Sequence, residues 1–375
     1  MASRQDLPPS HRWARLRCTV ASAALLLAVV LAVSSCQRDQ AAGTGTAATA
    51  ALAMLPAFTD PGVPTTGPAE QTVEPYRATI LPELAAKLPG KGLAEHPMLY
   101  IGEGHNTMSL VADGRVVWSY STGKGWEYDD IWLLSDGNVL FSRMSYAEEI
   151  SPRKEVLWHR DAPPGTEIHS LQPLDRERIL MLQNGPAPTV LIIDRRTGGV
   201  LMEHILVPPG GAPPGNVHGQ FRRIRATAAG TYLISWMSLG KVVEYDRDFK
   251  EIWSYATPRP WAAIRLHNGN TLISEESLRL VREVTQTGAT AWEFKLSELP
   301  PGIPFPDSQS CVRLANGNTV LCSRGDHGKG CQLVEITPDK RVSWALYDWH
   351  ALGPASAVQL LDDPGIPERP GDLQR

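Results

Sequence analysis

The sequence predicts an all-β protein, a six-bladed β-propeller built from four-stranded antiparallel blades. Three observations predict it. A hairpin with an Asn-Gly turn recurs along the chain, tryptophans follow these hairpins at a period of about 45 residues, and two incomplete units at the ends of the repeat region complement each other.

The clearest unit begins at residues 261–274, where an apolar run, the pair Asn268-Gly269 and a second apolar run follow one another. This pattern is typical of a β-hairpin, because both central residues of its tight turn need positive φ. Residues 282–284 and 288–294 supply a third and a fourth strand, joined by another turn that contains glycine. The stretch therefore predicts a four-stranded antiparallel unit.

The same unit recurs at 224–253 and at 310–344, and more weakly at 131–158 and 171–202. In the weakest unit Glu177 stands where the turn glycine is expected, and Met202 stands in place of the tryptophan. In the other five units the last strand carries Trp118, Trp158, Trp253, Trp292 or Trp344. We expect these indoles to pack between neighbouring blades rather than to form a ligand cage.

The two ends of the repeat region complete the count. Residues 98–120 supply three strands without a preceding hairpin strand, and residues 356–361 supply one isolated strand. If the last strand pairs with the first three, the ring closes. Closure removes the exposed sheet edges that an open array of blades would present. The sequence thus predicts a propeller over 98–365 and a loose tail over 366–375.

The N-terminal region has the layout of an export signal, a basic segment followed by an apolar run that ends at Cys36. The tetrapeptide that ends at Cys36 resembles the lipobox of bacterial lipoproteins, which implies a signal peptide over 1–35 and a lipid on this cysteine. A plain signal peptide or an uncleaved anchor is the alternative. Either arrangement places the protein outside the cytoplasm, in the periplasm or at the cell surface.

Between the signal and the propeller we expect two segments. Residues 36–75 are rich in Ala, Thr, Gly and Pro, which predicts a disordered tether. Residues 76–97 predict a lead-in with a short helix near 78–88, interrupted by Pro82, on the rim of the propeller or over one of its mouths.

The formal net charge of -4 argues against nucleic acid as a partner. Contact with the membrane is expected through the lipid alone, and we expect a monomer.

The motif Gly-x-Val-x-Trp in the last strand of a blade, as at 114–118, resembles the pyrroloquinoline-quinone-like (quinoprotein-like) β-propeller superfamily. The Asn-Gly-Asn-Thr hairpins and the stretch 217–222 are similar to secreted propellers of that kind, and more distantly to bacterial arylsulfotransferases. Quinone dehydrogenases of this superfamily have eight blades, a calcium site and a vicinal disulfide. The chain has six predicted blades and no Cys-Cys pair, so no quinone and no other cofactor is expected.

The arylsulfotransferase resemblance implies a channel histidine that accepts a sulfuryl group, helped by a second histidine and an arginine. His218, His169 and Arg222 are the candidates for these catalytic roles. The family motif has Asp after its histidine, whereas His218 is followed by Gly219, which weakens the resemblance.

A ligand site is expected at one mouth of the channel, because the innermost strands of a propeller begin there. These beginnings carry polar or aromatic residues that suit an anionic or polar ligand. The candidate ligand-binding residues are Asp130, His169, His218, Gln220, Arg222, Trp261 and Gln309.

Cys311, Cys322 and Cys331 remain after export. A two-residue turn at Asn316-Gly317 would place Cys311 opposite Cys322, whereas Cys322 and Cys331 flank the next loop. Either pair could form a disulfide, and we favour Cys322 with Cys331. The spacing of His, Cys, Asp and Glu along the sequence shows no cluster of metal ligands, so no metal is expected.

Two functions follow from the sequence. The first is a lipid-anchored, non-catalytic propeller that binds a polar small molecule, a glycan or an envelope protein at its central funnel. The alternative is an extracytoplasmic enzyme, an arylsulfotransferase-like transferase or a lyase, that uses the channel histidines and Arg222.

Overall fold

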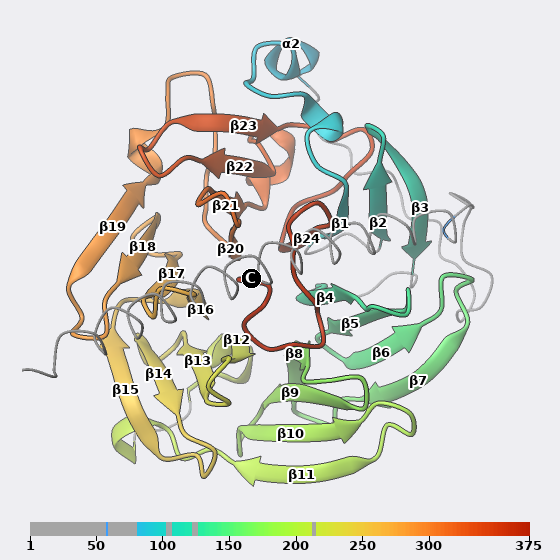
Figure 1. Cartoon of the computed structure of the whole chain (residues 1–375), viewed down its shortest axis with the longest axis vertical. Helices are drawn as coiled ribbons and strands as arrows, with labels where there is room; N and C mark the ends of the chain where they lie inside the picture. The colour runs from blue at the N-terminus through green and yellow to red at the C-terminus, as the bar shows by residue number, and fades with distance from the viewer. Residues whose placement is uncertain (1–57, 59–80, 103–106, 122–126, 212–214) are drawn as a thin grey trace, which may run out of the picture. The chain divides into compact units, whose positions relative to one another are not determined.

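The computed structural model describes residues 58, 81–102, 107–121, 127–211 and 215–375, which belong to one compact unit, Ala47–Arg375. The expected signal peptide, Cys36 and the tether lie outside the described residues. Within the described part of the chain, six four-stranded antiparallel sheets surround a central axis (Figure 1). The predicted six-bladed propeller is confirmed.

The first three blades follow the order of the chain, apart from one strand donated by its far end. Their strands, from the axis outward, are β24 (Ala357–Leu360), β1 (Met98–Ile101), β2 (Thr107–Ala112) and β3 (Arg115–Ser121) in blade 1; β4 (Asp130–Leu133), β5 (Val139–Arg143), β6 (Tyr146–Ile150) and β7 (Val156–Asp161) in blade 2; and β8 (Glu167–Pro173), β9 (Arg178–Asn184), β10 (Thr189–Asp194) and β11 (Val200–Ile205) in blade 3.

The other three blades repeat the pattern. Their strands are β12 (Phe221–Ala226), β13 (Tyr232–Trp236), β14 (Lys241–Tyr245) and β15 (Glu251–Ala256) in blade 4; β16 (Pro260–Arg265), β17 (Thr271–Glu275), β18 (Leu280–Val284) and β19 (Thr290–Lys295) in blade 5; and β20 (Cys311–Arg313), β21 (Thr319–Cys322), β22 (Leu333–Ile336) and β23 (Val342–Leu346) in blade 6. Short 3-10 turns connect some elements: η2 (Gly92–Ala94), η3 (Pro209–Gly211), η4 (Val217–Gly219), η5 (Leu296–Glu298) and η6 (Gly325–Gly328).

Blade 1 closes the ring as the sequence predicts. Strand β24 pairs antiparallel with β1, with Met98 opposite Leu360 and Ile101 opposite Ala357. The innermost strand of the first blade therefore comes from the C-terminal part of the chain, and the two ends of the repeat region are held in one sheet.

The tryptophans of the outermost strands join neighbouring blades. Trp253 donates from Nε1 to the carbonyl of Gln286 in blade 5 (2.9 Å), and Trp292 donates to the carbonyl of Pro338 in blade 6 (2.9 Å). Trp344 donates to Gly92 in the lead-in (3.0 Å). These indoles thus fill space between sheets and satisfy their single polar atom, as expected for a core role.

A carboxylate in the third strand of several blades adds an ion pair to the next blade. Glu149 pairs with Arg195 (2.7 Å) and Glu283 with Arg313 (3.0 Å). Glu283 also accepts bonds from Asn268 and Asn270, and turn asparagines donate to the matching carboxylates in blades 2 and 6, which explains the asparagines in these three turns. The recurring Asn-Gly turns therefore serve the contact between blades as well as the hairpin.

The lead-in helix differs from the expectation in its start, and of the two expected places it takes the rim. Helix α2 spans only Pro82–Ala85, and Pro82 lies at its first turn, where a missing N–H costs nothing, so proline begins the helix instead of interrupting it. Leu84 and Leu88 pack against the hydrophobic cluster that includes blade 6, and Leu81 N donates to the hydroxyl of Tyr347. The helix lies outside blade 6 and covers no mouth (Figure 1).

The expected disulfide is wrong, because Cys311, Cys322 and Cys331 are free and buried. The connection between β20 and β21 has one residue more than a two-residue turn, since Leu314 and Asn318 share its closing hydrogen bond. Cys311 therefore lies opposite Leu321, and Cys322 points to the other face of the sheet. Cys311 and Cys331 pack in one apolar cluster and Cys322 in another.

The C-terminal tail is packed instead of loose, and it crosses the ring at its centre (Figure 1). Gln374 forms a β-bridge with Arg313, and Ser135 donates to Glu368 from both its N–H and its hydroxyl (2.7 and 2.5 Å). The guanidinium of Arg375 lies 4.2 Å from the ring centre of Trp132. This segment shows no apolar pattern, because polar side chains hold it in place.

We call the two ends of the central channel the strand-start end and the turn end. The strand-start end is where the innermost strands begin, near Asp129, His169 and Arg222. The turn end is where the hairpins after these strands turn back, and the tail lies there, as its bonds to Ser135 and His267 show. No helix of the described residues is long and apolar enough to cross a membrane.

Candidate functional site

The site lies at the strand-start end and begins with Glu167, the first residue of β8. Its Oε2 atom accepts from His169 Nε2 (2.6 Å) and from His218 Nδ1 (3.0 Å). Burial alone would raise the pKa of Glu167, but the hydrogen bonds from the two imidazoles outweigh it and lower the pKa to about 2. Glu167 is therefore a fixed negative charge that orients both rings.

The two histidines approach the site from different elements. His169 is fully buried in β8, whereas His218 lies in η4, which Asn216 caps by accepting from the His218 N–H (2.9 Å). The rings stand edge to face with their centres 5.4 Å apart. The side chain of His218 is 48% exposed, so this ring faces solvent while its partner does not.

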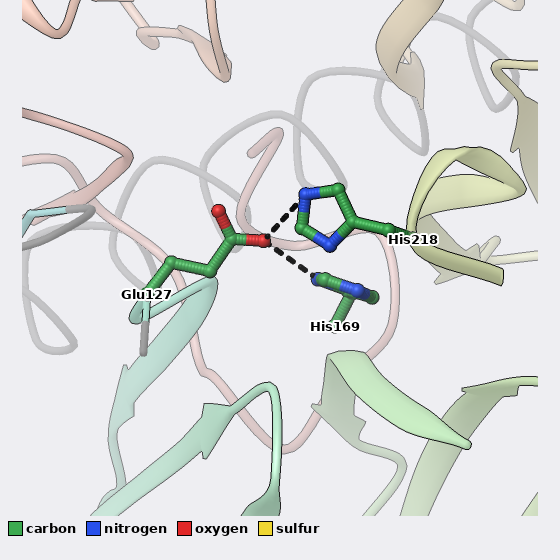
Figure 2. A group of neighbouring side chains, drawn as sticks. All are labelled: Glu127, His169 and His218. Atoms are coloured by element: carbon green, nitrogen blue, oxygen red, sulfur yellow. Dashed lines mark ion pairs between the residues drawn. The ribbon is translucent and has the colours of Figure 1, made fainter. Parts of the chain in front are cut away.

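Glu127 completes the group from the segment before β4. Its Oε1 lies 3.5 Å from His169 Nδ1 and 3.5 Å from His218 Nε2, and Figure 2 shows the carboxylate directed at both rings. Asp129 Oδ1 lies 3.0 Å from the same nitrogen of His169. Three carboxylates thus surround His169, and its two ring nitrogens can both donate only in the imidazolium form.

Arg222 brings positive charge to the group. Its Nη2 donates to His218 Nε2 (2.8 Å) and lies 3.5 Å from Glu127 Oε1, while Nη1 donates to the His218 carbonyl. The guanidinium also lies 5.0 Å from the ring centre of Trp261, close enough for a cation–π contact. Since His218 Nε2 accepts this bond, its proton is on Nδ1 and points to Glu167.

A cavity of about 490 Å³ opens beside this group. Arg259 and Arg324 lie on its wall and share Glu276, at 2.7 and 3.2 Å, and Arg324 also bonds Asp307 (3.1 Å). The cavity is lined by Asn216, His218, Gly219, Arg222, Met237, Ser238, Arg259, Trp261, Glu276 and Arg324.

Four of the residues predicted from the sequence meet here: His169, His218, Arg222 and Trp261. Gln220 does not take part, because its amide exchanges two hydrogen bonds with the backbone of Gly185 and fastens blade 4 to blade 3. Gln309 is buried at the start of β20 but does not line the cavity.

Asp130 also lies outside the site. It is buried deeper in the channel and accepts from Arg225 at 2.8 and 3.0 Å and from the Ser170 hydroxyl at 3.0 Å. Burial alone would raise its pKa, but Arg223 and Arg225 outweigh the burial and lower it. Asp130 is thus a structural ion-pair partner.

The expectation that no metal is bound stays a prediction, but the structure brings three possible metal ligands together. Glu127, His169 and His218 each offer one ligand atom, and these three atoms lie within 4.8 Å of one another. The sequence could not indicate this cluster, because its members come from three blades and have no regular spacing along the chain.

Sequence reasoning also missed Arg259, Glu276 and Arg324. Glu127 and Arg259 lie just before β4 and β16, and Arg259 has a positive φ of 46°, so strand alternation does not specify the direction of their side chains. Glu276 and Arg324 lie after the second strands β17 and β21, and no pattern in the sequence marks those ends.

Comparisons with known proteins support the fold. No protein-family model and no curated protein sequence matches the chain. A protein of unknown function from Bacteroides caccae is similar in structure, with a TM-score of 0.62 and 25% identity, over 70% of this chain and 97% of that chain. A catalytically inactive virginiamycin B lyase from Staphylococcus aureus with quinupristin is also similar, with a TM-score of 0.52 and 14% identity, over 74% and 97%. The fold defines a six-bladed β-propeller protein.

Proposed function

We propose that this protein is a lipid-anchored, extracytoplasmic and non-catalytic propeller that binds a polar small molecule or glycan with an anionic group in the cavity at the strand-start end. The observation that carries the proposal is the charge of the cavity wall. Arg222, Arg259 and Arg324 lie on it with a single carboxylate, Glu276.

The arginines differ in the contact they offer. The side chains of Arg259 and Arg324 are 51% and 40% exposed, so both can turn toward a ligand. Arg222 is only 5% exposed and is held between His218 and Trp261. A guanidinium binds carboxylate, sulfate or phosphate oxygens with two parallel hydrogen bonds, which suits an acidic ligand.

Trp261 and Met237 give the cavity an apolar part beside its charges. A sugar ring or an aromatic ring that carries an acidic group would place its flat face there and its charge on the arginines. The export signal and Cys36 support a location outside the cytoplasm and attachment through a lipid.

Calorimetric titration with phenyl phosphate and glucuronate, in EDTA, tests this function. We expect at least one of the two to bind, with its neutral counterpart, phenol or glucose, at least ~10-fold weaker, because each charge-assisted hydrogen bond is worth about 1.5–3 kcal/mol. Arg324→Gln should weaken the anion and leave the neutral counterpart unchanged. Equal binding of charged and neutral probes, or no binding of either anion, would overturn the proposal.

A second candidate is an enzyme that transfers or eliminates a group from an anionic substrate. One observation favours it. Glu167 accepts from His218 Nδ1 and so orients the ring, and His218 Nε2 points at Arg222. This is the arrangement of a base or nucleophile beside a charge-binding group. If it is correct, the wild type should turn over 4-nitrophenyl sulfate or a uronate polysaccharide, and His218→Ala should abolish turnover while the fold is kept. A wild type inactive on both substrates would argue against catalysis.

A further inference from the structure

The two histidines of the site are oriented in the way that metal-binding histidines usually are. Such histidines donate one ring N–H to a carboxylate or carbonyl, which fixes the other nitrogen toward the metal. Here Glu167 Oε2 accepts from His169 Nε2 and from His218 Nδ1. The remaining nitrogens, His169 Nδ1 and His218 Nε2, therefore point inward together.

Two of the three distances between the inward atoms match those between the ligands of a zinc ion. Both nitrogens lie 3.5 Å from Glu127 Oε1 (Figure 2). With Zn–N and Zn–O bonds of about 2.0–2.2 Å, tetrahedral geometry separates two ligand atoms by about 3.3–3.5 Å.

A buried polar atom at this place lacks a hydrogen bond. His169 Nδ1 is fully buried and has no hydrogen-bond partner in the described part of the chain, although Glu127 and Asp129 lie near it. Orphaned buried polar atoms are rare in native proteins and call for an explanation such as an ion.

We propose that Glu127, His169 and His218 bind one divalent transition-metal ion, with Zn²⁺ as the ion that best matches two imidazoles and a carboxylate. The metal would lie on the cavity wall and offer an open coordination position to an anionic ligand. The inference therefore deepens the proposed function, and it rests on that function for the role of the site. A His218 Nε2 atom that binds metal cannot also act as a base, so the inference favours binding over catalysis by that atom.

Arg222 is the competitor for this place. Its Nη2 contacts His218 Nε2 and Glu127 Oε1, two of the three ligand atoms, and supplies the positive charge that lets them converge. Metal binding requires the guanidinium to move away from these atoms into the cavity. Removing its charge should therefore tighten metal binding, the opposite of its effect on an anionic ligand.

The experiment is a calorimetric titration of the EDTA-treated, desalted full chain with Zn²⁺ alone, with Co²⁺ absorption as a check of geometry. We expect one ion per chain and tetrahedral Co²⁺ bands. His218→Ala, a half-exposed position that should not disturb folding, should weaken binding at least ~100-fold, and Glu167→Gln should weaken it ~10–100-fold, the usual effect of losing such a supporting carboxylate. Arg222→Met should tighten it several-fold.

His350→Ala is the matched control, because His350 is exposed and lies outside the site, and it should leave the affinity unchanged. Zn²⁺ binding that is absent, or that survives His218→Ala, would overturn the metal site. An Arg222→Met variant that binds Zn²⁺ no more tightly would overturn the placement of the metal beside Arg222.

The two proposals can fail separately. Phenyl phosphate and glucuronate are titrated in EDTA, and Zn²⁺ is titrated without them. Anion binding without Zn²⁺ binding would overturn the metal site alone, and the reverse result would overturn only the proposed ligand.

Discussion

The two ends of the central channel carry similar residues in different arrangements. At the turn end, the charged side chains of the innermost strands are buried among partners from several blades, and the C-terminal tail covers them. At the strand-start end, Glu127, Glu167, His218 and Arg222 gather beside a cavity. Buried charge is therefore no sign of a site by itself. What distinguishes the site is that its charges meet an opening.

The pairing that the tail covers centres on Asp130, which begins β4 and whose carboxylate meets Arg225 and Arg375 inside the channel. Arg225 binds both of its carboxylate oxygens, and Arg223 and Arg375 lie 3.8 and 4.0 Å away. One carboxylate thus serves three guanidiniums from β12 and the tail. If the charges under the tail are structural, substitutions among them should lower the free energy of unfolding. Substitutions at the strand-start end should instead weaken ligand binding.

The largest effect is expected from Asp130→Ala. It leaves the buried guanidiniums without their carboxylate, and breaking a buried ion pair in this way costs about 3–5 kcal/mol. Urea unfolding of the full chain should show a loss of this size. Arg153→Ala, which removes an exposed pair with Glu155, is the control and should cost less than about 1 kcal/mol. Similar losses in both variants would refute the structural role of Asp130.

A smaller effect is expected from Glu368→Ala in the tail. Glu368 accepts two hydrogen bonds from Ser135, and bonds to a charged group contribute about 1.5–3 kcal/mol. A double-mutant cycle with Ser135→Ala separates this contact from other effects. The losses of unfolding free energy in the two single variants should not add in the double variant, since both remove the Ser135 hydroxyl bond. Full additivity would show that this contact does not hold the tail at this end.

His96 makes the stability of the turn end depend on pH. Burial alone would lower its pKa, but hydrogen bonds to Asp362 and Glu335 outweigh it and raise the pKa from 6.5 to about 9. A raised folded-state pKa gives stability that is complete below pH 6.5 and is lost as the pH rises through about 9. Urea midpoints should fall across this window in the wild type and fall less in His96→Gln. Parallel profiles would show that another group is responsible.

The smallest effect on stability is expected from His218→Ala at the strand-start end. Its ring is half exposed, and surface changes away from the core usually alter stability by no more than about 0.5 kcal/mol. Binding of Zn²⁺ should nevertheless be lost or strongly weakened. A variant that unfolds more easily but binds as before would reverse the roles that we assign to the two ends.

The fold could be predicted because its signals are local and repeated. The Asn268-Gly269 turn fixes a hairpin within a few residues, and the tryptophan positions repeat the unit around the ring. The register of Cys311 could not be predicted in the same way, because one additional turn residue moves every later side chain to the other face.

The site could be predicted only in part. His169, Arg222 and Trp261 lie at strand beginnings, which any propeller brings to one mouth, and His218 lies close before one of them. Glu276 and Arg324 depend on which way the loops after the second strands turn, and no local pattern specifies that. The tail gave no signal either, since Gln374 and Arg375 are held by polar contacts with β20 and β12 rather than by an apolar stripe.

The pairing of β24 with β1 affects the order in which the chain folds. Five sheets are each built from consecutive strands, but the first cannot be completed until the strand that ends at Leu360 joins it. That contact spans most of the molecule, and such distant pairings form late and slowly. The half-built ring keeps two unsatisfied sheet edges until then, so a chaperone that shields strand edges would help this protein most before β24 pairs with β1.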